Sequence, residues 1–178
     1  VKKNNAFALR LFNKVTDMES KVISPMSVSY LMGMLANGAD GITQQEILKA
    51  IGCEGVSVND LNELYKAMLL NANHQDKQTT INIANYIAVN KNFKLNKNFS
   101  QQVSDSYQAG IESLDFTSSK STDRINGWCK EKTNGMIPRI IDQVSADAVS
   151  YLMNAIYFKG TWQNKFNAKD TKLENFRG

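Results

Sequence analysis

The single histidine, His74, is the first side chain to consider for acid–base or metal chemistry. An imidazole titrates near neutral pH, so a histidine can act as a general base or as a metal ligand when its surroundings hold it in place. Here the neighbours are Asn73, Gln75 and Asp76, at what reads as the polar end of a helix. We therefore expect a solvated histidine rather than a catalytic base or a ligand.

The two cysteines, Cys53 and Cys129, are far apart, and neither belongs to a Cys-x-x-Cys pair. Two cysteines are too few for a disulfide scaffold, so free thiols are expected. A nucleophilic thiolate needs an electropositive partner, and the sequence assigns none to Cys129. The phosphate-binding loop, the dinucleotide glycine pattern and the serine nucleophile elbow do not occur either. Enzymatic activity, a metal site and a bound cofactor are therefore not expected.

The composition is that of a globular protein. The 178 residues are 42% hydrophobic and 21% charged, with a formal net charge of +4, which is compatible with a buried core. The charged stretch from 120 to 132 mixes cations with Asp123 and Glu131, which is typical of a solvated helix face rather than a polyanion site. No apolar run is long enough to cross a bilayer. Neither nucleic acid nor membrane is expected as a partner.

The elements that would position any site include a long strand. Its apolar run extends from Ala148 to Trp162 and ends in Lys-Gly-Thr-Trp. Apolar side chains occupy both alternating sets of positions, so both faces of this strand are expected to be covered. Asn154 interrupts the run. Its amide either anchors a side-chain network or costs roughly 1–3 kcal/mol if it is buried without partners.

Helix and strand patterns alternate through the rest of the chain. Ser24 suits an N-cap with Pro25 at the first helical position. Thr43 to Glu46 reads as a capping box, and Gly52 suits a left-handed helix end. Helices are expected at 5–15, 24–38, 43–51, 58–73, 99–107 and 122–133, and further strands at 22–23, 79–89 and 111–116.

Three aromatic residues, Trp128, Trp162 and Phe166, lie at spacings that suit packing, and a core position is expected for each. No internal repeat or low-complexity linker interrupts the chain. We predict a single structural unit over residues 1–178, with helices packed on a sheet.

Several further fragments follow one another along the chain: Phe7 with Leu11-Phe12, Ser24-Pro25-Met26-Ser27, Gly38-Ala39-Asp40-Gly41-Ile42-Thr43, Ile83-Ala84-Asn85, Glu112-Ser113-Leu114-Asp115-Phe116, Ile125-Asn126-Gly127-Trp128 and Glu131-Lys132-Thr133-Asn134-Gly135. Together with the run from Asn154 to Trp162, and in this order, they resemble the motifs of the serpin family. The run from Asn154 to Trp162 is similar to the strand and turn that lead out of the middle of the large serpin sheet A. The resemblance covers essentially the whole chain and implies an α+β fold, with helices packed on a large mixed β-sheet.

The resemblance implies a suicide-substrate inhibitor of serine proteases, not an enzyme. In that family a protease cleaves an exposed reactive loop, is trapped as an acyl-enzyme and is distorted when the loop inserts as a strand into sheet A. Such a mechanism needs a metastable native state. Two alternatives stay open: a non-inhibitory serpin-fold binding or chaperone protein, and an inhibitor of cysteine proteases.

The resemblance also assigns candidate site residues. Ser24, Ser27 and Asn154 correspond to the shutter, a polar cluster under the middle of sheet A whose groups exchange partners as the strands part. Trp162 corresponds to the breach, where the loop first enters. The competing interpretation is that a buried Ser-Ser-Asn network merely satisfies a core. Ser20 stands where many serpins have asparagine, which puts one local hydrogen bond in doubt.

The chain matches about the first half of a serpin. The reactive centre lies in the second half, so the expected partners are a target serine protease and the C-terminal half of the same protein. No glycosaminoglycan site is expected, because the segment 58–73 holds only Lys66 against Asp60 and Glu63. We expect a secreted or extracytoplasmic protein. Alone, the chain would leave sheet edges and apolar faces uncovered, so instability or aggregation is predicted.

Overall fold

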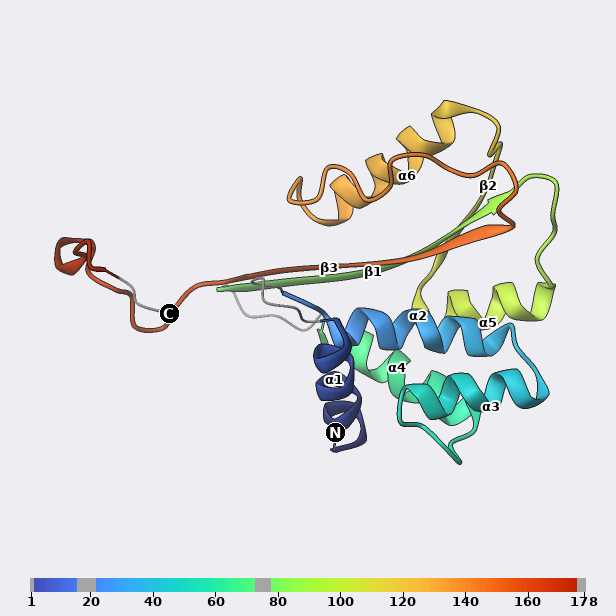
Figure 1. The fold of residues 1–178 in the computed structure, drawn as a ribbon, viewed down its shortest axis with the longest axis horizontal. Coiled ribbons are helices and arrows are strands. Elements are labelled where there is room, and N and C mark those ends of the chain that lie inside the picture. Colours follow the sequence, from blue (N-terminus) through green and yellow to red (C-terminus); the bar gives the residue numbers. More distant parts are fainter. Residues whose placement is uncertain (1, 16–21, 73–77, 176–178) are drawn as a thin grey trace.

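The computed structural model describes residues 2–15, 22–72 and 78–175 of the chain. Four helices precede the first strand, and helices and strands then alternate (Figure 1). The helices are α1 (Lys2–Val15), α2 (Pro25–Asn37), α3 (Gly41–Ala50), α4 (Val58–Ala72), α5 (Lys97–Tyr107) and α6 (Ser119–Lys132), the strands are β1 (Thr79–Asn90), β2 (Gly110–Leu114) and β3 (Ser150–Gly160), and a short 3-10 turn, η1, spans Ala168–Asp170.

The three strands form one mixed sheet in the order β2-β1-β3. β1 runs parallel to the short β2 and antiparallel to β3, which it pairs from Thr79 opposite Gly160 to Val89 opposite Ser150. The long central strand is rich in β-branched and aromatic residues, which favour a pleated, half-buried surface. The predicted α+β class with a mixed sheet is confirmed, and the described part of the sheet has three strands.

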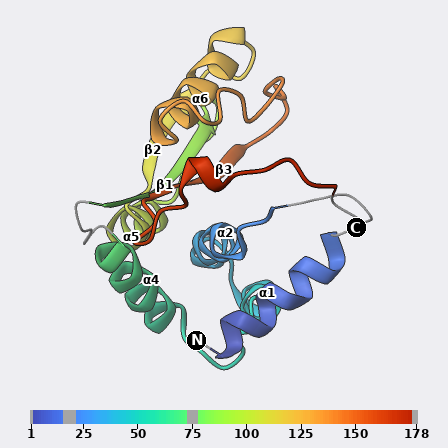
Figure 2. The ribbon, with the colours of Figure 1, turned by 90° about the vertical axis from the view of Figure 1, so that its left-hand side faces the viewer.

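Helices cover both faces of the sheet, in unequal layers. The thick layer of α1 to α5 lies on one face and α6 lies on the other (Figure 1). Within the thick layer, α2 occupies the centre, surrounded by its neighbours (Figure 2), and it contacts β3 directly. Strand alternation divides the core accordingly, with Ile87 and Leu152 facing the thick layer and Tyr86 and Met153 facing α6.

Local signals account for most of the helix ends. Ser24 caps α2 as predicted, and its hydroxyl accepts a hydrogen bond from the Ser27 N–H at 3.3 Å. Gly52 follows α3 with φ at 77°, the left-handed conformation expected there. The capping box at Thr43 was wrong: α3 begins at Gly41, and Asp40 is its N-cap, because the Asp40 carboxylate accepts from the Gly41 N–H at 2.7 Å.

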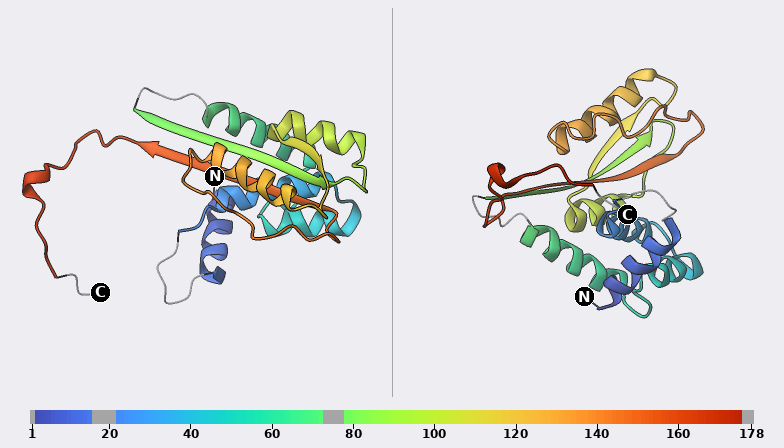
Figure 3. Two further views of the ribbon diagram at one scale, coloured as in Figure 1. Left: turned by 90° about the horizontal axis from the view of Figure 1, so that it is seen from above. Right: turned by 60° about the vertical axis from the view of Figure 1, so that its left-hand side comes forward.

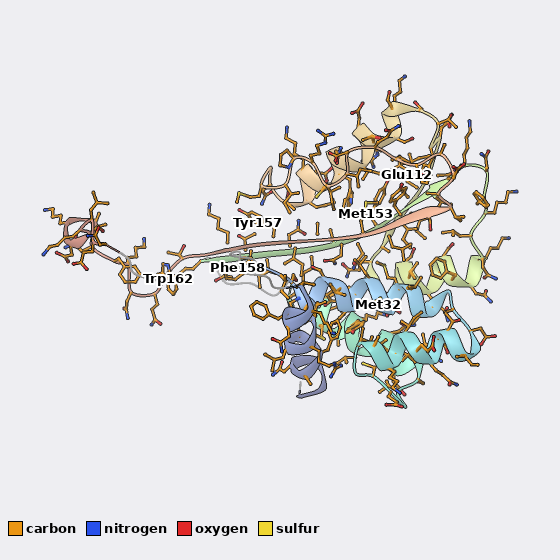
Figure 4. The ribbon with its side chains drawn as sticks, viewed as in Figure 1. Met32, Glu112, Met153, Tyr157, Phe158 and Trp162 are labelled. Carbon is orange, nitrogen blue, oxygen red and sulfur yellow. The ribbon has the colours of Figure 1, made fainter. Side chains whose placement is uncertain are left out.

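Two further predictions fail for one reason, the need for a neighbouring segment. No strand forms at 22–23, where the side chain of Val22 is fully exposed, because no described segment pairs with it. β3 is covered on both faces only as far as its middle, where Met153 and Ala155 are buried. Its last residues extend beyond both helical layers, so Phe158 is 67% exposed (Figure 4).

Candidate site at the free edge of the sheet

β3 forms one edge of the sheet, and it is longer than β2, the strand at the other edge. β1 pairs with one side of β3 along its whole length, and among the described residues no strand pairs with the other side. Seen from above, α6 overlaps β3, and no further strand arrow lies outside β3 (Figure 3). Edge strands are normally short, charged, bulged or interrupted by proline, because unpaired N–H and C=O groups invite another strand. This one is long and mostly apolar.

Asn154 lies in the middle of this strand, opposite Asn85 of β1. Its Nδ2 donates to Asn85 Oδ1 at 2.8 Å, and Asn85 Nδ2 donates to the main-chain oxygen of Tyr107 at 2.7 Å. The Asn154 Oδ1 atom is buried and has no hydrogen-bond partner in the part of the chain that the structure describes. Asn154 therefore anchors a side-chain network through its NH₂ group, which is one of the two alternatives that the sequence left open, while its Oδ1 acceptor is left over.

The direction of this chain of hydrogen bonds has a simple cause. A carbonyl oxygen only accepts, so Asn85 must turn its NH₂ group toward Tyr107. Its Oδ1 then faces Asn154, which must in turn offer its own NH₂ group. Asn154 Oδ1 is thereby left as an acceptor, and a buried acceptor without a donor costs roughly 1–3 kcal/mol. A strand that joins β3 with a donor at this level would remove that cost.

Ser24 and Ser27, the other two predicted shutter residues, lie at the start of α2. The Ser27 hydroxyl donates to Ser24 Oγ at 3.0 Å. Ser24 is exposed and Ser27 half-buried, while α2 as a whole packs against β3. The hydrogen bonds described for the serine pair and for Asn154 do not join the two, so their shared role as a shutter stays a prediction.

Trp162, the predicted breach residue, follows directly after the paired part of β3. The Thr161 N–H still donates to the Gln78 oxygen at 3.1 Å, and the chain then leaves the sheet. The Trp162 side chain is 73% exposed and Phe166 is 85% exposed, and their rings contact each other edge to face at 6.3 Å between centroids. The core position expected for both is wrong within this chain, because both side chains are strongly exposed, and Figure 4 shows Trp162 on the extension beyond the helical layers.

On the opposite face, α6 is attached to the sheet by an aromatic stack and an ion pair. The ring of Trp128 stacks on Tyr86 at 5.0 Å, and this tryptophan is buried as predicted. Arg124 binds the Glu112 carboxylate through two nitrogens at 2.8 and 3.1 Å, while Tyr86 Oη donates to the same group at 2.8 Å. Partial burial works to raise the pKa of Glu112, but the hydrogen bonds from Tyr86 and Arg124 outweigh it and hold that pKa below its usual range.

The residues that orient Asn154 were not predicted from the sequence. Asn85 carries a usable signal, because it is an asparagine inside an apolar strand, as Asn154 is. Tyr107 gave no such signal, because it contributes its main-chain oxygen, which every residue has.

Within the described ranges, the remaining candidates for chemistry form no catalytic or metal-binding group. Burial raises the pKa of the Cys129 thiol, which opposes thiolate formation. Among the described residues there is no group of three or more His, Cys, Asp or Glu side chains that could hold a metal ion. Nor does any helix in these ranges have the length and apolar character needed to span a bilayer. His74 and Ser20 lie outside the described residues.

Comparisons with known proteins agree on one family. Residues 2–178 match the family model described as Serpin (serine protease inhibitor). The chain is 33% identical over 181 residues to the leukocyte elastase inhibitor of Bos taurus, across 98% of this chain and 47% of that protein. The solved structure of tengpin, a thermophilic serpin in the latent state, superposes with a TM-score of 0.87 at 34% identity, over 94% of this chain and 46% of that one.

The complex of thyroxine-binding globulin with thyroxine also matches, with a TM-score of 0.82 at 26% identity over 93% of this chain and 46% of that one. The chain thus spans about half the length of the relatives it matches. The proteins that the chain matches thus include one named for inhibiting elastase and one named for binding thyroxine.

Proposed function

The chain belongs to the serpin family, and on that premise we propose that the protein containing it inhibits serine endopeptidases as a suicide substrate. The observation that carries this proposal is the open edge of β3, a long apolar strand whose outer side pairs with no described strand. A cleaved reactive loop that adds here would satisfy the edge N–H and C=O groups and bury its own side chains. That gain is the driving force for distorting a trapped protease.

The shutter and breach belong to the same proposal. Asn154 lies halfway along the edge and offers a buried, unpartnered acceptor, and Trp162 lies just past the end of β1–β3 pairing. We propose that an incoming strand first meets the sheet near Trp162. Ser24 and Ser27, on the helix beneath β3, would adjust their hydrogen bonds as the strand passes Asn154.

The partners follow from the mechanism. They are a serine protease and the remainder of the same protein, which supplies the reactive loop. An inhibitor meets its protease only in the compartment that holds it, and we propose an extracytoplasmic one, which fractionation of the source cells would check.

The test uses the complete gene product, incubated with trypsin-, chymotrypsin-, elastase- and subtilisin-like proteases and with a papain-like cysteine protease. Trapping predicts a band of summed mass on a denaturing gel, because the acyl bond survives denaturation. The same protease with its active-site nucleophile chemically blocked is the control, and it should give no such band. A band with the papain-like enzyme and with none of the serine proteases would instead indicate an inhibitor of cysteine proteases.

A second candidate is a non-inhibitory binding or chaperone protein, favoured by the match to thyroxine-binding globulin. The melting temperature before and after cleavage of the loop separates the two. A large rise on cleavage shows that the loop inserts and stabilises the sheet. Cleaved product with fully active protease and an unchanged melting temperature would overturn the inhibitory proposal.

A further inference from the structure

A second chain of hydrogen bonds lies inside the thick helical layer. Asn37 of α2 and Asn62 of α4 exchange two hydrogen bonds, at 2.9 and 2.8 Å, and Asn37 Nδ2 also donates to the Gly33 oxygen at 2.8 Å. The hydroxyl of Tyr107, at the end of α5, donates to the same Asn62 Oδ1 at 2.9 Å. Three helices are thus joined by one continuous polar link.

This link is buried among aromatic rings. The Tyr107 side chain is fully buried and that of Asn62 nearly so, and the ring of Tyr107 contacts Tyr65 at 5.8 Å and Tyr30 at 6.5 Å between centroids. Burial raises the pKa of Tyr107 above its usual range, so the hydroxyl keeps its proton and remains a donor. Gly33 makes the approach possible, since a Cβ there would lie 2.6 Å from Tyr107 Oη.

Tyr107 belongs to both hydrogen-bond chains. Its side chain is held by Asn62, and its main-chain oxygen receives Asn85 Nδ2 at 2.7 Å. Directly after it, Gln108 adopts the left-handed conformation with φ at 51°, so the backbone turns away from α5 at this point. The hydrogen bond to Asn62 holds the Tyr107 side chain, and we expect it thereby to fix the direction of the Tyr107 main-chain carbonyl.

We propose that Tyr107 is a positioning residue, through which α2 and α4 fix the direction of the Asn85–Asn154 amide pair. If the pair flipped, Asn85 Oδ1 would face the Tyr107 carbonyl, and two acceptors repel. With the carbonyl held in place, Asn154 Oδ1 stays an acceptor at the open edge of β3. What that acceptor is for rests on the proposed function, whereas the positioning itself does not.

The experiment follows the side-chain NH₂ groups of Asn85 and Asn154 by NMR hydrogen exchange in the full-length protein, labelled with ¹⁵N-asparagine. Tyr107→Phe keeps the ring and removes the hydroxyl. We expect both NH₂ groups to exchange about tenfold faster, as the loss of a buried hydrogen bond allows. Tyr30→Phe is the matched control in the same aromatic cluster, and it should leave both exchange rates unchanged.

Two further variants, Asn62→Ala and Asn37→Ala, extend the test to the far end of the link. Asn37 is half-buried, so Asn37→Ala is the milder change and replaces Asn62→Ala if that variant fails to fold. Asn59→Ala, at an exposed position on α4, is the control for both. If Tyr107→Phe and Asn37→Ala lower the melting temperature but leave the Asn85 and Asn154 exchange rates unchanged, the link is only structural and the proposal is wrong. The readout involves no protease, so absence of a covalent protease band would leave this result standing.

Discussion

At the scale of single residues, the direction of a hydrogen bond matters more than its presence. The Tyr107 carbonyl dictates the orientation of Asn85, and Asn85 dictates that of Asn154. The consequence is a buried acceptor without a described partner, Asn154 Oδ1, on the edge strand β3. If a strand joins β3, as the proposed function requires, one with a donor at this level should pair better than one without.

The first prediction concerns Asn85. Asn85→Ala should destabilise the full-length protein by about 1–3 kcal/mol, because it leaves the Asn154 amide and the Tyr107 carbonyl without their partner in a buried site. Asn59→Ala, an exposed asparagine on α4, should change stability by less than about 0.5 kcal/mol. Urea unfolding measures both. Equal effects of the two substitutions would contradict the central place given to Asn85.

The second prediction concerns pH and the Glu112–Arg124 ion pair. The pKa of Glu112 is below its usual value of 4.5, so folding favours the charged form, and this stabilisation is present above pH 4.5 and lost as the pH falls through the lowered pKa. Wild-type protein should therefore be more stable than Glu112→Gln at pH 7, and the difference should vanish in acid. Unfolding curves of both proteins from pH 7 to pH 3 test this, and a difference that is constant with pH would refute it.

At the scale of elements, close approach between helices decides where glycine is needed. Gly33 lies in α2 where Tyr107 of α5 and Tyr65 of α4 converge, and an added Cβ would lie 2.6 and 2.8 Å from their atoms. Gly127 lies in α6 with nothing within 4 Å of such a Cβ. A side chain thus has no room at Gly33, whereas it has room at Gly127.

The third prediction follows from this contrast. Gly33→Ala should lower the free energy of unfolding by about 1–3 kcal/mol, because the added methyl group would overpack the aromatic cluster. Gly127→Ala should instead stabilise by about 0.5–1 kcal/mol, because alanine loses less backbone freedom on folding into a helix. Thermal and urea unfolding of the two full-length variants give the signs directly. A stabilising Gly33→Ala would show that the cluster of Tyr30, Tyr65 and Tyr107 adjusts easily.

At the scale of the whole molecule, the sheet is asymmetric. β1 is central, β2 is a short strand that α6 and its ion pair hold in place, and β3 carries an open edge and an aromatic extension away from both helical layers (Figure 1). Phe158, Trp162 and Phe166 are all strongly exposed on that extension. Apolar surface of this kind is covered by a partner or leads to association.

The fourth prediction is that residues 1–178, produced alone, are unstable or aggregate. The open edge of β3 and the exposed aromatic side chains would seek partners in other copies of the chain. Light scattering and size-exclusion chromatography during a thermal melt provide the measurement. A monomer that unfolds in one sharp two-state transition would contradict this prediction.

The sequence by itself determined what depends on neighbouring residues. Ser24 with Pro25 started α2 and Gly52 ended α3, because caps and turns are set by a few adjacent side chains. The motifs in their order were also enough to predict the α+β class and the family. Asn154 stood out because a single amide in an apolar strand needs partners.

Only the tertiary structure decided which segments meet. The strand order β2-β1-β3, the pairing of Asn154 with Asn85, and the convergence of Asn37, Asn62 and Tyr107 join residues far apart in the chain. Trp162 is a second example, because its aromatic side chain predicted a core position, yet no described segment covers it. Whether a residue is buried or paired depends on which other segments pack against it, and packing across the whole fold decides that.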